Sequence, residues 1–451
     1  MSKIQKNNPV IIIGAGVAGM YAARCLRQVG KPFVLLEATD KHGGRIRPLI
    51  DPKFSDFPIE LGAENIHGDK NQTGTENSFL YRDIMQHNPN LLRQVFTGGP
   101  TQDELYQVGN ETFWDSSYQH KEIDKVWKRL KKLKKYTGKD ITVAQYLAKK
   151  GIDKDHCCWN FYQALIGAEY GTTVDELGMF SLAQERRNWK TGNKDYGFSE
   201  KNYLSTLEEI YFTEILPEII YNFPVHKIDI KPQQVVVHGP NNLHYSSPKV
   251  LLTVPLGVLK ANTIKFVPPL PKEKQLAIET IGMDGGMKII LSFRKRFWPK
   301  RMLGFLTNQR IGYGWATGHV RKSGSNRFLT CFIMGKRANF FATMTPEEQK
   351  MHCLQELDSL FPPDLATKHF VELRCMNWKK QPYIRGSYSY PSPNTQFKDG
   401  PSMRSLLAKP IGDRLFFAGE ATAKNHPATV HGAMESARTT IRNMFPQMRF
   451  V

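Results

Sequence analysis

The chain lacks the patterns that would mark a membrane protein, a secreted disulfide scaffold or a zinc protein. No apolar run approaches the roughly 20 residues that span a bilayer. The short basic N-terminus leads directly into a glycine motif and does not have the layout of a cleavable signal. Cysteine is scarce: the 6 residues are scattered and form no CxxC pair. These absences predict a cytoplasmic protein with reduced thiols, no metal site and no membrane span.

Acidic residues are fewer than basic residues. The chain has 62 Lys and Arg and only 42 Asp and Glu, which gives a formal net charge of +20. The densest basic stretch is KEIDKVWKRLKKLKKY, residues 121–136. Its apolar residues recur at helical spacing, which predicts an amphipathic helix with a solvated lysine face. No helix-turn-helix, RNA-recognition or zinc-finger pattern accompanies it. We therefore expect no specific nucleic-acid partner, and only a weak attraction to anionic surfaces.

At 451 residues the chain is long enough for two domains. Residues 10–13 and 32–36 are predicted strands on either side of a glycine turn and a helix over about 18–29. Residues 120–220 have a mostly helical pattern, and strands alternate with Pro, Gly and Asn from residue 225 onward. Helices are predicted at 270–281, 346–360 and 429–445. This order indicates a mixed α/β and α+β fold with a second domain inserted in pieces.

The glycine turn carries the first chemical signal. It reads GAGVAG over residues 14–19, directly after a strand and at the start of a helix. Glycines there allow a tight turn and let the backbone approach a pyrophosphate at the helix N-terminus. Glu37 ends the second strand, where a carboxylate can accept hydrogen bonds from both ribose hydroxyls. We predict an adenine dinucleotide other than NADP, with contacts from Gly14, Ala15, Gly16, Ala18, Gly19 and Glu37.

The following segment, Lys41-His42-Gly43-Gly44-Arg45, offers two backbone amides and a guanidinium that can hold a flavin dinucleotide. From here the sequence resembles the flavin amine oxidase family, which includes polyamine oxidases, monoamine oxidases, L-amino acid oxidases and flavin-type lysine demethylases. The resemblance runs from residue 10 to about 445. It rests on GAGVAG with LLEATDKHGGRI, IELGAENIHG, LTVPLGVLK before FVPPLP, IGMDGGMKI, WKKQPYIRGSYSY and FFAGEATAKNHPATVHGA.

The resemblance implies the amine oxidase fold: a Rossmann-type FAD-binding domain and a discontinuous substrate domain of sheet and helices. We expect the FAD-binding domain to comprise residues 1–83, 205–288 and 401–451, and the substrate domain 84–204 and 289–400. The FAD is expected to be non-covalent, because Ser387 stands where monoamine oxidases carry the flavin-linking cysteine. The further FAD contacts that the family implies are Ala38, Gly43, Gly44, Arg45, Leu61, Gly62, Ala63, Glu64, Val225, Trp378, Gly419, Glu420, Ala428, Thr429, Val430 and Ala433.

Lys288 lies in GMDGGMKIILSF, residues 282–293, at the start of an apolar run that is typical of a strand. If side chains alternate, Lys288 shares a face with Ile290 and Ser292, while the residues between them share the other. An ammonium beside this much hydrocarbon needs a partner or a route to water. It either extends to solvent from a strand end, or it is the lysine that, in the family, holds a water at the flavin N5.

Other residues match positions on the family's substrate side. Tyr388 corresponds to one of two aromatic side chains that flank the substrate carbon, and the second position is Thr429, a departure from monoamine oxidases. His67 matches an active-site histidine of polyamine oxidases. Glu64 and Glu169 match acidic positions that can receive a distal ammonium. We predict Lys288, His67 and Tyr388 as catalytic, and Glu64, Glu169, Tyr388 and Thr429 as substrate-binding.

The predicted reaction is oxidation of an amine, with polyamines as the substrates. The amine would give a hydride to flavin N5, the imine would be hydrolysed, and O₂ would be reduced to H₂O₂. One alternative is an L-amino acid oxidase or monooxygenase, which needs an arginine for the substrate carboxylate, with Arg385 as the candidate. Another is a basic chromatin- or nucleic-acid-associated protein with this fold, of the methyl-lysine demethylase kind, which requires a contiguous basic face.

Overall fold

A parallel sheet follows from the strand–turn–helix–strand pattern at the N-terminus. The computed structural model of the protein describes residues 8–68, 78–96, 104–108, 111–114, 121–192, 194–322, 324–361 and 363–448. The sheet has the order β10-β2-β1-β14-β23, and all of its strand pairs are parallel. Its strands are β1 (Val10–Ile13), β2 (Phe33–Leu36), β10 (Ile219–Ile220), β14 (Val250–Leu252) and β23 (Leu415–Phe417).

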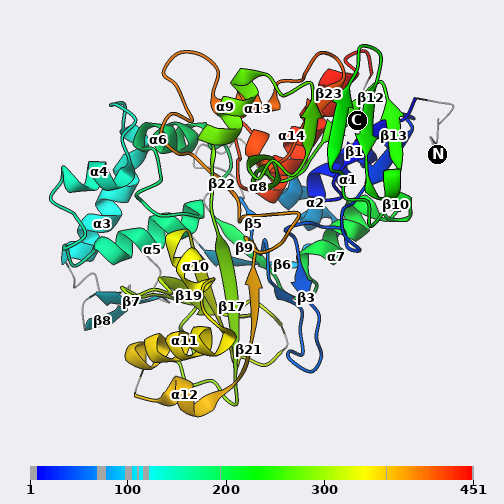
Figure 1. The fold of residues 1–451 in the computed structure, drawn as a ribbon. Coiled ribbons are helices and arrows are strands. Elements are labelled where there is room, and N and C mark those ends of the chain that lie inside the picture. The colour runs from blue at the N-terminus through cyan, green and yellow to red at the C-terminus, as the bar shows by residue number, and fades with distance from the viewer. Residues whose placement is uncertain are drawn as a thin grey trace.

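Both faces of this sheet are covered, as expected of parallel strands. Val10 and Ile12 of β1 enter one core, and Ile11 and Ile13 enter the core on the opposite face. In Figure 1, α1 (Val17–Gln28) and α14 (Val430–Met444) pack side by side although they come from opposite ends of the chain. They cover the first core with α2 (Phe79–His87) and α7 (Tyr203–Leu207).

The other face meets α8 (Leu256–Lys260), α9 (Lys272–Thr280) and α13 (Met403–Ala408). A second sheet of order β13-β12-β11-β15 contributes to the same core. Its strands are β11 (Lys227–Ile230), β12 (Val235–His238), β13 (His244–Ser247) and β15 (Lys265–Val267). The predicted helix at 270–281 is thus confirmed.

A larger sheet of order β21-β17-β20-β19-β18-β7-β8 forms the other half of the molecule. Its strands are β7 (Glu104–Val108), β8 (Glu111–Trp114), β17 (Gly286–Phe293), β18 (Gly304–Leu306), β19 (Tyr313–Ala316), β20 (Phe328–Met334) and β21 (Phe370–Asn377). The helices α10 (Lys336–Phe341), α11 (Pro346–Leu360) and α12 (Leu365–His369) pack against it. Three small sheets, β3-β4, β5-β9-β6 and β16-β22, are formed by the strands β3 (Pro48–Leu49), β4 (Ile59–Glu60), β5 (Ile66–His67), β6 (Leu92–Phe96), β9 (Asp195–Phe198), β16 (Gly282–Met283) and β22 (Ser389–Tyr390).

A helical block lies beside this sheet, on the left in Figure 1. It consists of α3 (Lys121–Lys132), α4 (Val143–Ala148), α5 (Trp159–Tyr170) and α6 (Met179–Asn188). The predicted amphipathic helix is α3, whose Ile123, Val126 and Leu130 are buried. The lysines lie on its other side. The division of the chain into two discontinuous domains at the residues given above remains a prediction.

The cysteines and the helix lengths concern three expectations from the sequence: reduced thiols, no metal site and no membrane span. All six cysteines are free. His156, Cys157 and Cys158, just before α5, have ligand-type atoms within 4.8 Å of one another, but they lie outside the cavity described below. Within the described part of the chain, every helix is too short or too polar to cross a bilayer.

A buried lysine fixes the end of α13. The Lys274 ammonium, from α9, donates to the carbonyls of Leu406, Leu407 and Lys409 at 3.1, 2.8 and 2.6 Å. It also lies 3.8 Å from the centre of the Phe417 ring. A cation at a helix C-terminus offsets the negative end of the helix dipole and satisfies the last carbonyls. This contact joins α9 to α13 and so holds α13 against the parallel sheet.

Burial lowers the pKa of Lys274 to about 7. Below that pH, Lys274→Met should lower the free energy of unfolding by about 1.5–3 kcal/mol, because buried carbonyls lose a charged donor. Denaturant titration of the purified protein measures the change. Lys272→Met is the matched control, since Lys272 is exposed on the same helix. Equal unfolding midpoints for the two variants would contradict this role for Lys274.

Candidate active site

A cavity of about 1700 Å³ runs from the glycine turn to the substrate-side helices α5 and α6. It lies between the parallel sheet and the larger sheet. Of the sequence-predicted site residues, Ala15 and Gly19 are absent from its lining, because Ala15 is buried behind the turn and Gly19 packs against it. The others line it: Gly14, Gly16, Ala18, Glu37, Ala38, Gly43, Gly44, Arg45, Leu61, Gly62, Ala63, Glu64, His67, Glu169, Val225, Lys288, Trp378, Tyr388, Gly419, Glu420, Ala428, Thr429, Val430 and Ala433.

The glycine turn at one end of the cavity is tight and open toward the cavity. Gly14 has φ +103°, and a side chain at Gly19 would lie 1.9 Å from the Gly14 carbonyl oxygen. A side chain at Gly16 would meet no atom within 4 Å. The Glu37 carboxylate at the end of β2 accepts hydrogen bonds from the backbone N–H groups of Ala15 at 2.9 Å and Thr39 at 3.0 Å. The glycine turn therefore holds the Glu37 carboxylate beside the N-terminus of α1.

This end of the cavity fits a flavin dinucleotide. The first amides of α1 face it, and a side chain at Gly419, which has φ +136°, would also meet open space. Such empty positions leave room for a ligand against the backbone. Arg45 and Arg47 line the middle of the cavity, and the buried Nε of Arg47 has no partner among the described residues. Cations and helix N-terminal amides are suited to a diphosphate.

Lys288 is on β17 and does not extend to solvent. Its residue is 3% exposed. Its ammonium donates to the carbonyls of Glu60 at 2.9 Å and Gly62 at 3.0 Å and to the Glu64 carboxylate at 2.7 Å. The predicted alternation is confirmed, because Ile290 packs in one cluster and Ile289 in another. All three N–H donors are engaged, so binding a water requires Lys288 to release one of these acceptors.

Glu64 is shared between two partners. Besides the Lys288 ammonium, it accepts a hydrogen bond from the Trp315 indole Nε1 at 3.3 Å. The Lys288 Nζ lies 5.1 Å from the centre of the Trp315 ring. Glu60 lies next to this group with its carboxyl buried, and burial raises the pKa of Glu60 to about 7. The Lys288–Glu64 ion pair and the Trp315 ring therefore line the cavity together.

His67 is held by the register of a short sheet. In the β5–β9 pair it stands opposite Asp195. Its Nδ1 is 2.7 Å from the Asp195 carboxylate, so the neutral ring donates its proton there. Burial acts to lower the pKa of His67, but the Asp195 carboxylate outweighs it and the pKa lies above its usual value. Asp195 therefore shifts His67 toward the protonated form relative to a free histidine.

Tyr388, Thr429 and Glu169 complete the substrate side. The Tyr388 hydroxyl donates to the Ala168 carbonyl at 2.5 Å, and its ring packs on Gly171 at the end of α5. The Thr429 hydroxyl donates to the His426 carbonyl and accepts from the Gly432 N–H as the N-cap of α14. The Glu169 carboxylate is paired with Arg186 at 2.9 Å. The two hydroxyl groups and the Glu169 carboxylate therefore each have at least one partner within the protein.

Sequence reasoning missed three residues of this region: Asp195, Trp315 and Arg186. Each contacts a predicted site residue from a distant segment, and no local motif marks it. The nearest signal is the short alternating stretch DYGF at β9, which predicts a strand but not its partner. Arg385, named as the arginine for a substrate carboxylate, also lines the cavity. Its Nε donates to the Pro382 carbonyl at 2.9 Å, and its backbone lies against Gly257 of α8. Arg186 is the arginine beside Glu169.

The chain matches a family model described as "Flavin containing amine oxidoreductase" over residues 17–444. It is similar to Lysine-specific histone demethylase 1 homolog 3 of Arabidopsis thaliana, with 28% identity over 94% of this chain and 29% of that protein. It thus spans under a third of that relative's length. It is also similar to Polyamine oxidase 5 of Oryza sativa subsp. japonica, with 27% identity over 95% of this chain and 85% of the relative.

Two solved structures share the fold. A putrescine oxidase bound to putrescine has a TM-score of 0.78 at 16% identity and covers 99% of both chains. Cyclohexylamine oxidase from Brevibacterium oxydans has a TM-score of 0.77 at 18% identity, over 98% of this chain and 99% of its own. The predicted amine oxidase fold is confirmed. With the family model spanning residues 17–444, the chain belongs to the flavin-containing amine oxidoreductases and is a flavin-dependent amine oxidase.

Proposed function

We propose that the protein is an FAD-dependent oxidase of polyamines. The observation that carries the proposal is the continuous cavity, which joins the glycine turn and Glu37 to the group formed by Lys288, Glu64 and Tyr388. When bound, FAD takes two electrons from the amine carbon–nitrogen unit and passes them to O₂, which yields an imine and H₂O₂. The length of the cavity accommodates a dinucleotide at one end and an amine at the other.

The residues of the substrate half have distinct roles in this proposal. Lys288 and Glu64 hold a proton at a buried, hydrogen-bonded site beside the reacting centre, and release of one Lys288 acceptor lets water bind there. Tyr388 provides an aromatic wall that can orient an amine, and its hydroxyl contact with Ala168 fixes the ring. His67 lines the cavity, and its hydrogen bond to Asp195 would orient the ring toward the substrate.

Polyamines are proposed on two grounds. Relatives at about 27–28% identity bear the name polyamine oxidase. The lining of the substrate half also contains carboxylates, among them those of Glu64, Glu104, Glu169 and Asp195. The formal charge of +20 opposes a polycation at long range, and three of these acids have cationic or imidazole partners. Attraction would therefore arise only within the cavity, at short range.

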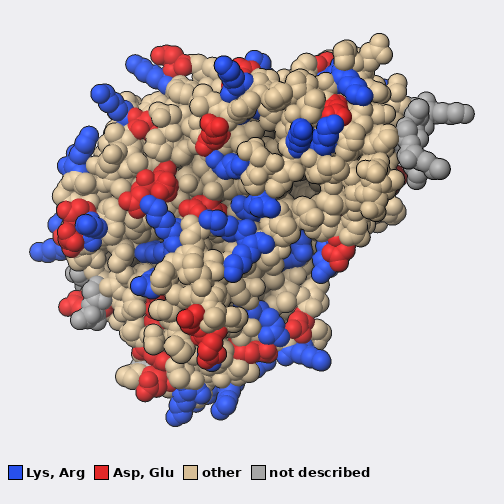
Figure 2. Space-filling model, in the orientation of Figure 1, with Lys and Arg blue, Asp and Glu red and all other residues tan. Residues whose placement is uncertain are grey.

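An amine that carries a carboxylate is the second candidate. Arg186 lines the same end of the cavity as Glu169, and Lys131 and Lys134 of the basic helix region line its wall. These cations would accept an anionic group. The alternative of a nucleic-acid-associated protein is less supported, because in Figure 2 Lys and Arg are interspersed with Asp and Glu over the visible face.

A substrate screen tests the proposal. We expect H₂O₂ release with spermine or spermidine and little with monoamines, amino acids or a methyl-lysine peptide. Peroxide-coupled absorbance measures each rate, with heat-inactivated protein as the blank. Preferential turnover of amino acids would replace the polyamine assignment with the second candidate, and no turnover of any amine would contradict the proposed function.

Lys288→Met should preserve FAD content while slowing a step at the flavin. Removal of the ammonium leaves Glu64 without its cation and abolishes the proton site. Stopped-flow absorbance of the oxidised flavin separates reduction by anaerobic amine from reoxidation by O₂. At least one rate should fall about tenfold or more, which corresponds to about 1.4 kcal/mol of barrier. Lys265→Met, at an exposed strand lysine, is the control. Wild-type rates for both steps would show that Lys288 is structural.

Glu37→Ala should weaken FAD retention far more than it alters turnover per bound FAD. The carboxylate is positioned for the ribose, and each charge-assisted hydrogen bond contributes roughly 1.5–3 kcal/mol. FAD occupancy after exhaustive dialysis is read from the ratio of flavin to protein absorbance. Asp40→Ala, an exposed acid in the same turn, is the matched control. Full occupancy of the Glu37 variant would argue against ribose binding.

A further inference from the structure

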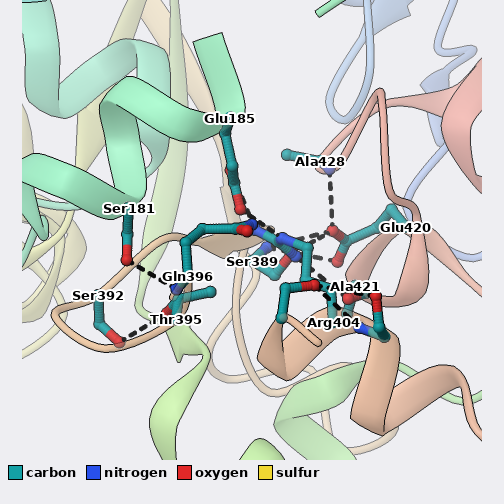
Figure 3. Close-up of polar contacts among 12 residues, drawn as sticks. Ser181, Glu185, Ser389, Ser392, Thr395, Gln396, Arg404, Glu420, Ala421 and Ala428 are labelled. Carbon is teal, nitrogen blue, oxygen red and sulfur yellow. Dashed lines mark hydrogen bonds and ion pairs between the residues drawn. The ribbon is translucent and has the colours of Figure 1, made fainter. Parts of the chain in front are cut away.

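A buried charge network extends from the substrate-side helix α6 to Glu420 (Figure 3). At its centre is Arg404 of α13, a residue that is 1% exposed and does not line the cavity. Its Nε donates to the Glu185 carboxylate at 2.6 Å, and its Nη1 donates to the Ser389 hydroxyl at 2.6 Å and to the Ala421 carbonyl at 3.2 Å. Arg404 therefore contacts three segments that are far apart in the sequence.

The contact with Ser389 fixes the direction of a proton. Because an Arg404 N–H occupies an acceptor position of the Ser389 oxygen, the hydroxyl hydrogen is free to point the other way. It donates to the Glu420 carboxylate at 2.6 Å, and the Ser389 backbone N–H donates to the same group at 3.3 Å. A guanidinium has no acceptor, so this polarity cannot be reversed.

Glu420 in turn holds the segments that border the FAD end of the cavity. It accepts from Arg45 at 2.9 Å and from the Ala428 N–H at 3.1 Å. Ala428 has φ +61°, an unfavourable value for a residue with a side chain, and directly precedes the N-cap of α14. Arg45 also donates to the Ser387 carbonyl at 2.8 Å. Tyr388 thus lies between two residues that the network restrains.

The network is electrically balanced within the protein. Glu420 and Glu185 are 6% and 5% exposed, and Arg404 and Arg45 supply the opposite charges. Burial acts to raise the pKa of Glu420, but Arg45, Ser389 and Arg404 outweigh it and the pKa lies below its usual value. Glu420 therefore remains a carboxylate beside the position proposed for the FAD diphosphate, where two like charges would otherwise repel.

We propose that Arg404 is a positioning residue for the cofactor and for Tyr388, which it aligns through the Ser389 hydroxyl and Glu420. It couples the helix that carries Arg186, the partner of Glu169, to the FAD-facing loop at Ala428. The inference rests on the proposed function, because it takes FAD to bind against Glu420. Its contact with the ligand is indirect, so its loss should weaken FAD and amine binding through Ser389 and Glu420. This effect is separate from the loss of stability caused by the unpaired Glu185 carboxylate.

Four variants test the proposal: Arg404→Met, Arg404→Lys, Ser389→Ala and the double variant Arg404→Met with Glu185→Met. FAD affinity is measured by reconstitution of the apoprotein, from the quenching of FAD fluorescence, and stability by the thermal midpoint of the apoprotein. We expect Arg404→Met to raise the FAD Kd at least tenfold and to lower the midpoint. Arg404→Lys should recover part of the affinity. Arg442→Met, at an exposed arginine of α14, is the control.

The double variant separates positioning from mere charge balance. Removing both buried charges should restore the thermal midpoint, since no uncompensated carboxylate remains at Glu185. The FAD Kd should stay raised, because the Ser389 hydroxyl still lacks its donor. Recovery of both affinity and stability would overturn the proposal, as would a wild-type Kd for Arg404→Met.

Ser389→Ala keeps the Arg404–Glu185 pair and removes only the hydroxyl that connects Arg404 to Glu420. This variant therefore tests the proposal even if the Arg404 variants fail to fold. It should raise the FAD Kd several-fold and raise KM for the amine more than it lowers kcat, whereas an unchanged Kd would overturn the proposal. If the wild-type chain binds FAD but oxidises no amine, the proposed substrate chemistry fails, and the Kd measurements still decide the role of Arg404.

Discussion

The pairing of buried charges is the constraint on which the site depends. Two sheets meet around a cavity that must hold an anionic dinucleotide, and ionised side chains there are costly unless each has a partner. The protein meets this requirement with three pairs: Lys288–Glu64, Arg45–Glu420 and Arg404–Glu185. Their members lie 219 to 375 residues apart in the sequence. The same contacts that neutralise the charges therefore join the two halves of the fold.

Pairing also limits how the cavity can recognise a substrate. A carboxylate that already has a cation at 2.7–2.9 Å exerts less attraction on an incoming ammonium than a lone one. Under the proposed function, selection among amines would then depend on the shape of the cavity and on the aromatic ring of Tyr388, and less on net charge. In this arrangement the surface charge of +20 affects the approach of a substrate more than its final position.

The parts of the fold that sequence reasoning predicted are those with local causes. The strand, turn and helix over Val10–Gln28 follow from apolar runs and glycines, and α11 matches the predicted 346–360 because Thr345 and Glu348 form a capping box. Lys288 was identified as an unusual charge in an apolar strand. The strand β21 was not predicted, because it is an edge strand with a largely half-buried, partly charged pattern. The partners of Lys288, His67 and Glu169 were not predictable either, because register and long-range packing bring them together.

Arg404 illustrates why a buried ion pair needs a reason other than stability. Hydrophobic residues of similar volume commonly stabilise a core as well as a salt bridge does, because the desolvation cost offsets the attraction. An apolar side chain at this position would fill the space between α6 and α13, but it could not donate to the Ser389 oxygen. Arg404 would then no longer orient the Ser389 hydroxyl toward Glu420, and Glu420 would lose one of the guanidinium charges that lower its pKa. Arg404 orients the Ser389 hydroxyl, and such orientation is what a site assembled from distant segments requires.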